Sequence, residues 1–91
     1  MLKINLEARV KKFLRKLPAK HERQIVGKIF LIAENPLQHD VKPLHGYAPW
    51  HRADIGEYRI IFSTDGEWLR ILIVGKRNDS DVYKRFGKLF K

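Results

Sequence analysis

The stretch from residue 58 to residue 74 limits the fold most strongly, because it predicts two strands joined by a tight turn. In residues 58–63 side chains alternate with the period of a strand, and in residues 68–74 nearly every position is apolar except Arg70. Asp65 and Gly66 tolerate the positive φ that a two-residue hairpin turn requires. We therefore expect an antiparallel pair whose second strand is covered on nearly both faces.

Two amphipathic helices are predicted ahead of this hairpin. A short strand at residues 2–4 is followed by Asn5, a good N-cap, and by apolar residues at helical spacing up to Leu17. Pro18 breaks this helix and suits the first turn of a second one, which ends at Asn35-Pro36. The outward faces of the two helices are expected to carry the basic residues Lys11, Lys12, Arg15, Lys16, Lys20, Arg23 and Lys28.

The remaining segments complete a single α+β domain over residues 1–91. Residues 37–49 show no periodicity and are expected to form a loop, and residues 51–55 form a short strand before the turn at Gly56. Asn78, Asp79 or Ser80 caps a last helix, whose apolar side carries Val82, Phe86, Leu89 and Phe90. This order predicts a small, mostly antiparallel sheet with a two-helix N-terminal hairpin packed on it and a short C-terminal helix.

The charge of the chain points to a polyanionic partner. Nineteen Lys and Arg stand against ten Asp and Glu, a net charge of +9, and the excess lies in the two ends that are predicted to be helical. Nucleic acid or an acidic protein is the expected partner, and metabolite enzymes are disfavoured. Cysteine is absent, which excludes disulfides, thiolate zinc sites and a cysteine nucleophile. We expect a cytoplasmic protein that does not interact with membranes.

The usual hydrolytic and metal motifs are not found in the sequence. Three histidines are six residues apart, a spacing that fits metal ligands on neither a helix nor a strand, so no metal or other cofactor is expected; they are His39, His45 and His51. Ser63 and Ser80 lack a neighbouring base and oxyanion motif. The carboxylates of Asp54 and Glu57 flank a turn, a common place for acids, and do not suggest a catalytic pair.

The basic residues of the strand region are better candidates for chemistry. Arg59 lies within an apolar strand, Lys76 and Arg77 follow the buried strand, and Tyr83 lies about one turn into the last helix. If these side chains converge on one face of the sheet, the arginines could clamp a phosphate, and the tyrosine could stack on a base or move a proton. On residue types alone, ordinary structural roles for strand arginines and helix aromatics remain the favoured interpretation.

At these residues the sequence resembles the RelE/ParE superfamily of bacterial and archaeal type II toxins, and most closely its RelE branch. Residues 52–62 (RADIGEYRIIF), the Asp-Gly hairpin and residues 74–83 (VGKRNDSDVY) carry the resemblance, which extends over nearly the whole chain. The resemblance implies the same small sheet with two N-terminal helices on one face.

RelE-like proteins cleave mRNA in the ribosomal A site, where a 2′-hydroxyl attacks the adjacent phosphorus without a metal. The resemblance implies that Arg59 and Arg77 stabilise the pentacovalent phosphate, and that Tyr83 stacks on the RNA or transfers a proton. Relatives often carry two basic residues on the preceding strand, and here Asp54 stands where the second, after Arg52, is expected. The general base is therefore open, with His51 as a candidate substitute.

The resemblance also implies partners and contacts. The expected partners are the ribosome, mRNA and an acidic, RelB-like antitoxin, and the toxin itself is expected to be monomeric. Expected RNA-binding residues are His51, Arg52, Lys76, Lys84, Arg85, Lys11, Lys12, Arg15 and Lys16. Two alternatives stay open: a ParE-like inhibitor of DNA gyrase, and an RNA-binding module without catalytic activity.

Overall fold

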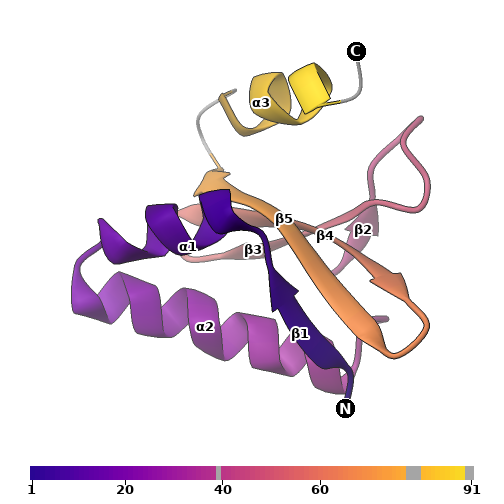
Figure 1. Cartoon of the computed structure of the whole chain (residues 1–91), viewed down its shortest axis with the longest axis horizontal. Helices are drawn as coiled ribbons and strands as arrows, with labels where there is room; N and C mark the ends of the chain where they lie inside the picture. Colours follow the sequence, from indigo (N-terminus) through magenta and orange to yellow (C-terminus); the bar gives the residue numbers. More distant parts are fainter. Residues whose placement is uncertain (39, 78–80, 90–91) are drawn as a thin grey trace.

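A five-stranded sheet with helices on both faces forms the molecule (Figure 1). The computed structural model describes residues 1–38, 40–77 and 81–89. In chain order the elements are β1 (Lys3–Leu6), α1 (Ala8–Arg15), α2 (Ala19–Glu34), β2 (Lys42–Pro43), β3 (His51–Ile55), β4 (Tyr58–Asp65), β5 (Trp68–Lys76) and α3 (Asp81–Leu89). The strand order is β1-β5-β4-β3-β2, and every neighbouring pair is antiparallel except β1 with β5. The predicted α+β fold is confirmed.

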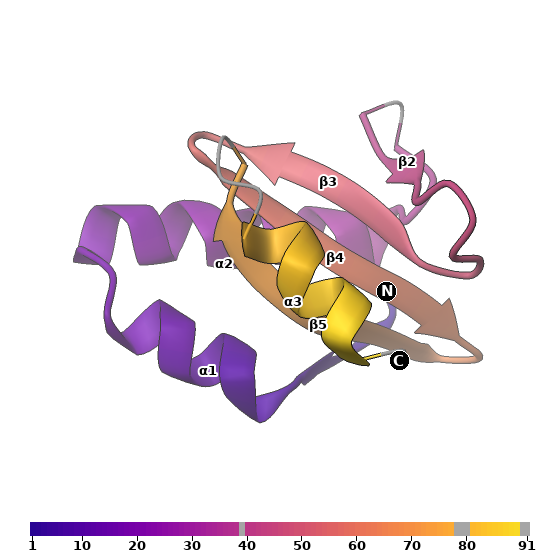
Figure 2. The same ribbon diagram turned by 90° about the horizontal axis from the view of Figure 1, so that it is seen from above.

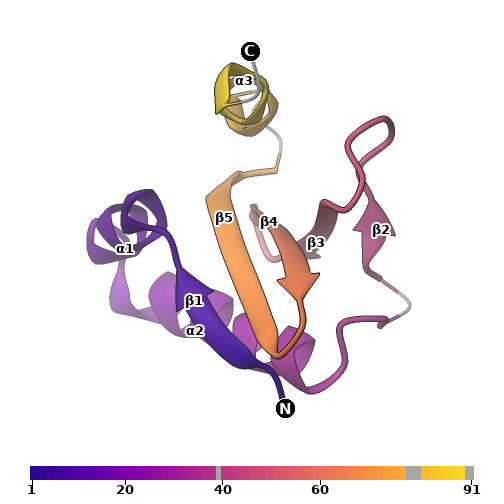
Figure 3. The same cartoon turned by 45° about the vertical axis from the view of Figure 1, so that its right-hand side comes forward.

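The sheet separates two apolar clusters. The larger one lies beneath α1 and α2 and includes Val10, Ile25 and Ile60, whereas the smaller one includes Ile61 and the α3 residue Phe86. Figure 1 shows α2 below the sheet and α3 above it, Figure 2 shows α3 lying over β5 and β4, and Figure 3 shows α3 beyond the end of β5, apart from α1 and α2. Both faces of β4 and β5 are thus buried, and for β5 this was predicted from its apolar sequence.

One irregularity explains why β5 is apolar at consecutive positions. The pairing of β4 with β5 shifts between Ile61, opposite Ile73, and Phe62, opposite Ile71, so Leu72 is an extra residue on β5. Leu72 and Ile73 both belong to the cluster under α3, whereas Ile71 belongs to the one under α1 and α2. The bulge therefore lets two successive side chains pack against α3.

The beginning of the first helix was predicted wrongly. Asn5 lies within β1, opposite Arg70 of β5, and α1 starts at Ala8 after Glu7, which makes no side-chain capping bond. The parallel pairing with β5 extends β1 by satisfying backbone groups that a helix would otherwise satisfy. The predicted loop at residues 37–49 also contains the two-residue strand β2, which pairs with the beginning of β3.

Lys28 was expected on the outward face of the second helix, and this expectation is wrong. Its side chain is only 8% exposed, and its ammonium group is paired with the carboxylate of Asp40 and donates to Gln38 Oε1 at 3.3 Å. The segment after α2 folds back over this part of the helix and supplies both partners. A charged residue of the helix is thereby buried with its charge compensated.

The ends of α2 agree with the sequence, since Pro18 precedes its first residue and Asn35 follows its last. In α3, Val82 and Phe86 are buried as expected, but Leu89 is exposed. The predicted cap at Asn78, Asp79 or Ser80 and the apolar contact of Phe90 lie outside the described residues.

Gly75 allows α3 to approach β5 closely, so Gly75→Ala is expected to destabilise the protein. A Cβ at this position would lie 2.6 Å from Arg85 Nη2 and 2.8 Å from Val82 Cγ2. We expect the free energy of unfolding to fall by about 1–3 kcal/mol, because the buried Val82 must move. Gly87→Ala is the matched control: its Cβ has no neighbour within 4 Å, so it is expected to stabilise the helix by about 0.5–1 kcal/mol. Urea unfolding measures both, and equal effects would contradict this packing.

Candidate functional site

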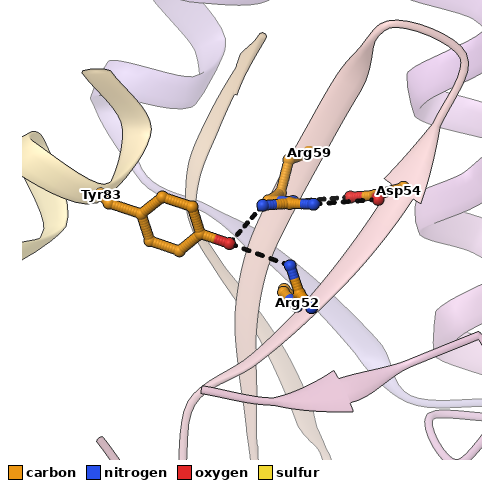
Figure 4. Close-up of polar contacts among 4 residues, drawn as sticks. All are labelled: Arg52, Asp54, Arg59 and Tyr83. Atoms are coloured by element: carbon orange, nitrogen blue, oxygen red, sulfur yellow. Dashed lines mark hydrogen bonds and ion pairs between the residues drawn. The ribbon is translucent and has the colours of Figure 1, made fainter. Parts of the chain in front are cut away.

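Four polar side chains meet where β3, β4 and α3 come together (Figure 4). Arg52 and Asp54 are two residues apart on β3, so both side chains point to the face that α3 covers. The antiparallel register places Asp54 opposite Arg59 of β4. Tyr83 extends from the first turn of α3 toward both arginines. We call these four residues the arginine–tyrosine cluster.

The guanidinium group of Arg59 is held in a fixed orientation. Its Nε donates to Asp54 Oδ1 at 2.7 Å and its Nη2 donates to Asp54 Oδ2 at 3.1 Å. The remaining Nη1 donates to the Tyr83 hydroxyl, and the guanidinium carbon lies 5.4 Å from the centre of the Tyr83 ring. The Arg59 side chain is only 14% exposed, so this two-point ion pair is shielded from water more than a surface pair is.

Two cationic groups converge on the Tyr83 hydroxyl. Besides the bond from Arg59, this oxygen accepts a hydrogen bond of 3.1 Å from Arg52 Nη1. Tyr83 is 37% exposed, so solvent or a ligand reaches the place where the two donors meet. Converging guanidinium donors of this kind are suited to binding an oxyanion such as a phosphate oxygen.

The charges of the cluster keep Asp54 ionised. The pKa of Asp54 is lowered from its usual 3.8, first by its hydrogen bonds from Arg59 and, against the opposing effect of burial, also by the positive charges of Arg59, Arg52 and Arg77. The hydrogen bond to Asp54 in turn raises the pKa of Arg59. At neutral pH Asp54 is therefore a carboxylate of low basicity, and it orients Arg59.

Asp54→Asn is expected to remove a pH-dependent contribution to stability. Because folding lowers the pKa of Asp54, its ion pair stabilises the folded state above pH 3.8 and loses this effect as the pH falls through the folded-state pKa. The Asp54 side chain is 38% exposed, so we expect a loss of less than about 1 kcal/mol at pH 7. Urea unfolding between pH 2.5 and 7 measures the difference, with Glu34→Gln as an exposed control. If wild type and Asp54→Asn differed in free energy of unfolding as much below pH 3 as at pH 7, this role would be contradicted.

Arg77 lies near the cluster but is not bonded to it in the structure. It directly follows β5, its side chain is exposed, and its backbone N–H donates to the Glu57 carbonyl oxygen at 2.8 Å. Its charge is close enough to lower the pKa of Asp54. Lys76, opposite Tyr58 in the register, is exposed at the same end of the sheet.

The two basic residues after Tyr83 differ in position. Lys84 is exposed on α3, whereas Arg85 is partly buried and its Nη2 donates to the Val74 carbonyl oxygen at 3.2 Å. Arg85 therefore attaches α3 to β5 across Gly75. This structural contact competes with the RNA contact that was expected of Arg85.

His51 is separated from the cluster by the alternation of β3. Its Nδ1 donates to the Pro49 carbonyl oxygen at 2.9 Å, and its ring stacks on Phe62 with centroids 5.8 Å apart. Phe62 belongs to the apolar cluster beneath α1 and α2. The residue considered as a substitute base thus lies on the opposite face from Arg52, Asp54 and Tyr83.

The basic residues of α1 form a surface of their own. Lys11, Lys12, Arg15 and Lys16 are exposed. Their helix packs with α2 on the face of the sheet opposite α3. A cavity of about 460 Å³ between β1, α1 and α2 lies on this side, and apart from Asn5 and Lys11 its lining is apolar. We refer to the four exposed residues as the α1 basic surface.

Sequence reasoning missed a second cavity, which borders the cluster. It has a volume of about 380 Å³ and lies between residues 43–47 and α3, with Arg52 and Tyr83 in its wall. Tyr47 is the aromatic residue that the loop contributes. No local pattern marks Tyr47, because its place beside α3 depends on contacts between distant parts of the chain.

The described part of the chain contains neither a cluster of metal ligands nor a membrane-spanning helix. Within residues 1–38, 40–77 and 81–89, no group of three or more His, Asp or Glu side chains is placed to hold a metal ion. None of the helices in the described part of the chain is both long and apolar enough to cross a membrane. His39 lies outside the described residues, and His45 is exposed.

Comparison of sequences gives no match, either to protein-family models or to curated proteins. The solved structures with a similar fold include RelE toxins. RelE in the RelE–RelB complex of Pyrococcus horikoshii has a TM-score of 0.73 at 26% identity over 84% of this chain and 94% of its own. The RelBE2 complex of Mycobacterium tuberculosis gives a TM-score of 0.73 at 26% identity, over 84% of this chain and 98% of the matched chain. A mutant of Escherichia coli RelE in the free state gives a TM-score of 0.80 at 22% identity, over 99% of this chain and 98% of its own.

These similarities confirm the resemblance to RelE toxins that the sequence motifs indicated. The chain has the RelE fold over nearly its whole length, and its relatives support a RelE-like toxin.

Proposed function

We propose that this chain is the toxin of a type II toxin–antitoxin system and that it cleaves mRNA on the ribosome. The observation that supports this proposal best is the arginine–tyrosine cluster, in which Arg52 and Arg59 both donate to the exposed Tyr83 hydroxyl. The net charge of +9 favours a polyanionic substrate. The likeness to RelE toxins supports the same class of function.

In the proposed reaction a ribose 2′-hydroxyl attacks the adjacent phosphorus. The O2′–P bond forms, the P–O5′ bond breaks, and the products are a 2′,3′-cyclic phosphate and a 5′-hydroxyl. Negative charge accumulates on the non-bridging oxygens in the transition state, where Arg59, Arg52 and Arg77 stabilise it. Asp54 already accepts from Nε and Nη2 of Arg59, so Arg59 approaches the phosphate from the Nη1 side of its guanidinium group, which also bonds Tyr83.

The proton of the 2′-hydroxyl needs an acceptor. Asp54 is a carboxylate of low basicity that is bound to Arg59, and His51 lies on the other face of the sheet. Tyr83 is the remaining group of the cluster that can exchange protons: its hydroxyl oxygen can take the 2′-hydroxyl proton while its own proton passes to the leaving 5′-oxygen. Its ring can instead stack on a base. The proposed roles of Tyr83 are therefore proton transfer or stacking, and Tyr83→Phe separates them because it keeps the ring and removes the hydroxyl.

The proposed regulatory partner is an acidic, RelB-like antitoxin that folds on the basic toxin. Two of the similar solved structures are complexes of a RelE toxin with its antitoxin. A monomer with a net charge of +9 attracts a disordered acidic segment, which loses its conformational freedom only on binding.

Neutralising the α1 basic surface is expected to reduce the salt dependence of ribosome binding. Lys11, Lys12, Arg15 and Lys16 are replaced together by glutamine, and the dissociation constant is measured between 50 and 200 mM salt. Each lost phosphate contact lowers the slope of log K against log salt by about 0.7–0.9. The exposed positions of these residues predict an unchanged fold. An unchanged slope would place the binding surface elsewhere.

One paired assay tests the proposed function against its alternatives. The purified protein is added to ribosomes programmed with mRNA, and cleavage is detected by primer extension; in parallel it is added to DNA gyrase in a supercoiling assay. We expect cleavage and no effect on gyrase. Inhibition of gyrase without cleavage would favour the ParE-like alternative, and ribosome binding without either effect would favour a non-catalytic RNA-binding module.

A further inference from the structure

We propose that the 380 Å³ cavity between residues 43–47 and α3 binds one unpaired base of the RNA, next to the phosphate at the arginine–tyrosine cluster. We call this cavity the loop–α3 pocket. The inference rests on the proposed function in that it takes RNA as the ligand. It adds a site that would give the protein a sequence preference.

Aromatic side chains make the pocket suitable for a flat heterocycle. Leu44 and Phe86 are buried and form apolar lining, while Tyr47 is 46% exposed. The rings of Tyr47 and Phe86 meet edge to face with centroids 5.0 Å apart. The partly exposed ring of Tyr83 lines the same cavity. Stacking on aromatic rings is the usual way in which proteins hold unpaired RNA bases.

The pocket and the cluster share two residues, so one nucleotide can occupy both. Arg52 and Tyr83 line the pocket, and they are joined to each other by the hydrogen bond between Arg52 Nη1 and the Tyr83 hydroxyl. A phosphate at these donors would therefore place an attached base at the mouth of the pocket. The pocket is also large enough for one base, since binding cavities begin at about 300 Å³.

The charge of the lining favours RNA over a cationic ligand. Among the described residues that line the loop–α3 pocket there is no Asp or Glu, whereas Arg52 and the exposed His45 offer hydrogen bonds to base edges. The neighbouring hollow that contains Asp40 and Asp54 has a volume of only about 90 Å³. It is too small for a base, and its carboxylates would repel the backbone.

Backbone hydrogen bonds within the loop support the position of Tyr47. The Tyr47 N–H donates to the Leu44 carbonyl oxygen at 3.0 Å, and the Trp50 N–H donates to the Tyr47 carbonyl oxygen at 2.9 Å. Trp50 is buried, and its ring lies 6.0 Å from that of Phe86. Binding a base would therefore require little additional ordering of the loop.

The test measures whether Tyr47 and one RNA base depend on each other. Ribosomes are programmed with mRNA whose A-site codon and its neighbours carry 2′-O-methyl groups, which prevent cleavage, and abasic nucleotides are introduced one position at a time. Dissociation constants are measured for the wild type, Tyr47→Phe and Tyr47→Ala. Trp68→Ala is the matched control, because Trp68 is also 46% exposed but lies at the β4–β5 turn.

We expect one abasic position to weaken binding of the wild type, Tyr47→Phe and Trp68→Ala about tenfold. Tyr47→Ala should bind mRNA that has all its bases about tenfold more weakly than the wild type does. Removing the base at that position should weaken its binding no further. Equal abasic effects in the wild type and Tyr47→Ala would overturn the pocket, even if unmodified mRNA is cleaved. An effect of Tyr47→Ala on antitoxin binding alone would overturn it in favour of a protein ligand. If the effect of the abasic position depended on Tyr47 but unmodified mRNA were not cleaved, base binding in the pocket would be supported and the nuclease activity would be rejected.

Discussion

Arg59→Ala is expected to lower the rate of mRNA cleavage on programmed ribosomes about a hundredfold, on the order of 3 kcal/mol in the transition state. The Nη1 donor of Arg59 is directed at the Tyr83 hydroxyl, beside which a phosphate oxygen is proposed to bind. This contact strengthens as negative charge accumulates on phosphate, so the single-turnover rate falls more than the affinity for the ribosome. Primer extension at saturating protein measures the rate.

A matched variant separates catalysis from loss of charge. Arg70 is also a strand arginine in an ion pair, with its Nε 3.0 Å from Glu7 Oε1, but it lies outside the cluster. Arg70→Ala is expected to change the cleavage rate less than threefold, because Arg70 lies outside the cluster and its partly exposed ion pair adds at most about 1 kcal/mol to the stability of the fold. Equal losses for Arg59→Ala and Arg70→Ala would remove Arg59 from the active site.

Arg77→Ala is expected to have an effect of the same size, about a hundredfold on the cleavage rate. Arg77 is exposed at the end of β5, and its charge acts on the same carboxylate as Arg52 and Arg59. Within the described residues its guanidinium group is bonded to no member of the cluster and can meet the phosphate, whereas that of Arg59 is already held by Asp54.

Folding provides an independent check on Arg77→Ala. The bond between the Arg77 backbone N–H and the Glu57 carbonyl oxygen does not need the side chain. We therefore expect an unchanged midpoint of thermal unfolding together with the loss of cleavage. Cleavage at the wild-type rate would show that Arg77 takes no part in the reaction.

Strand periodicity predicted the part of the site that depends on neighbouring strands. The alternation in β4 placed Arg59 on the face opposite Tyr58, and the short connection at Gly56 brings β3 alongside it. The same alternation, applied to β3, separates Arg52 and Asp54 from His51. His51 was considered as a base because it is next to Arg52 in the sequence. The alternation of β3, which places the two side chains on opposite faces of the sheet, was not taken into account.

Features that depend on distant parts of the chain could not be predicted in the same way. β1 pairs with β5 across more than sixty residues, which turned the expected cap at Asn5 into part of a strand. The helical pattern alone predicted that Lys28 is exposed, because it does not show that the segment after α2 places Asp40 against it. Tyr47 lies in a stretch without periodicity, and only the docking of α3 gives it a neighbour in Phe86.

The chemistry of the cut ends tests the central claim most directly. Wild-type protein is added to ribosomes programmed with mRNA, and the ends are mapped, with a second mRNA that carries a 2′-deoxynucleotide on the 5′ side of the cut. The proposed attack by the 2′-hydroxyl predicts a 2′,3′-cyclic phosphate, a 5′-hydroxyl and no cleavage of the 2′-deoxy mRNA. A 3′-hydroxyl with a 5′-phosphate, cleavage of the 2′-deoxy mRNA, or no cleavage at all would contradict it.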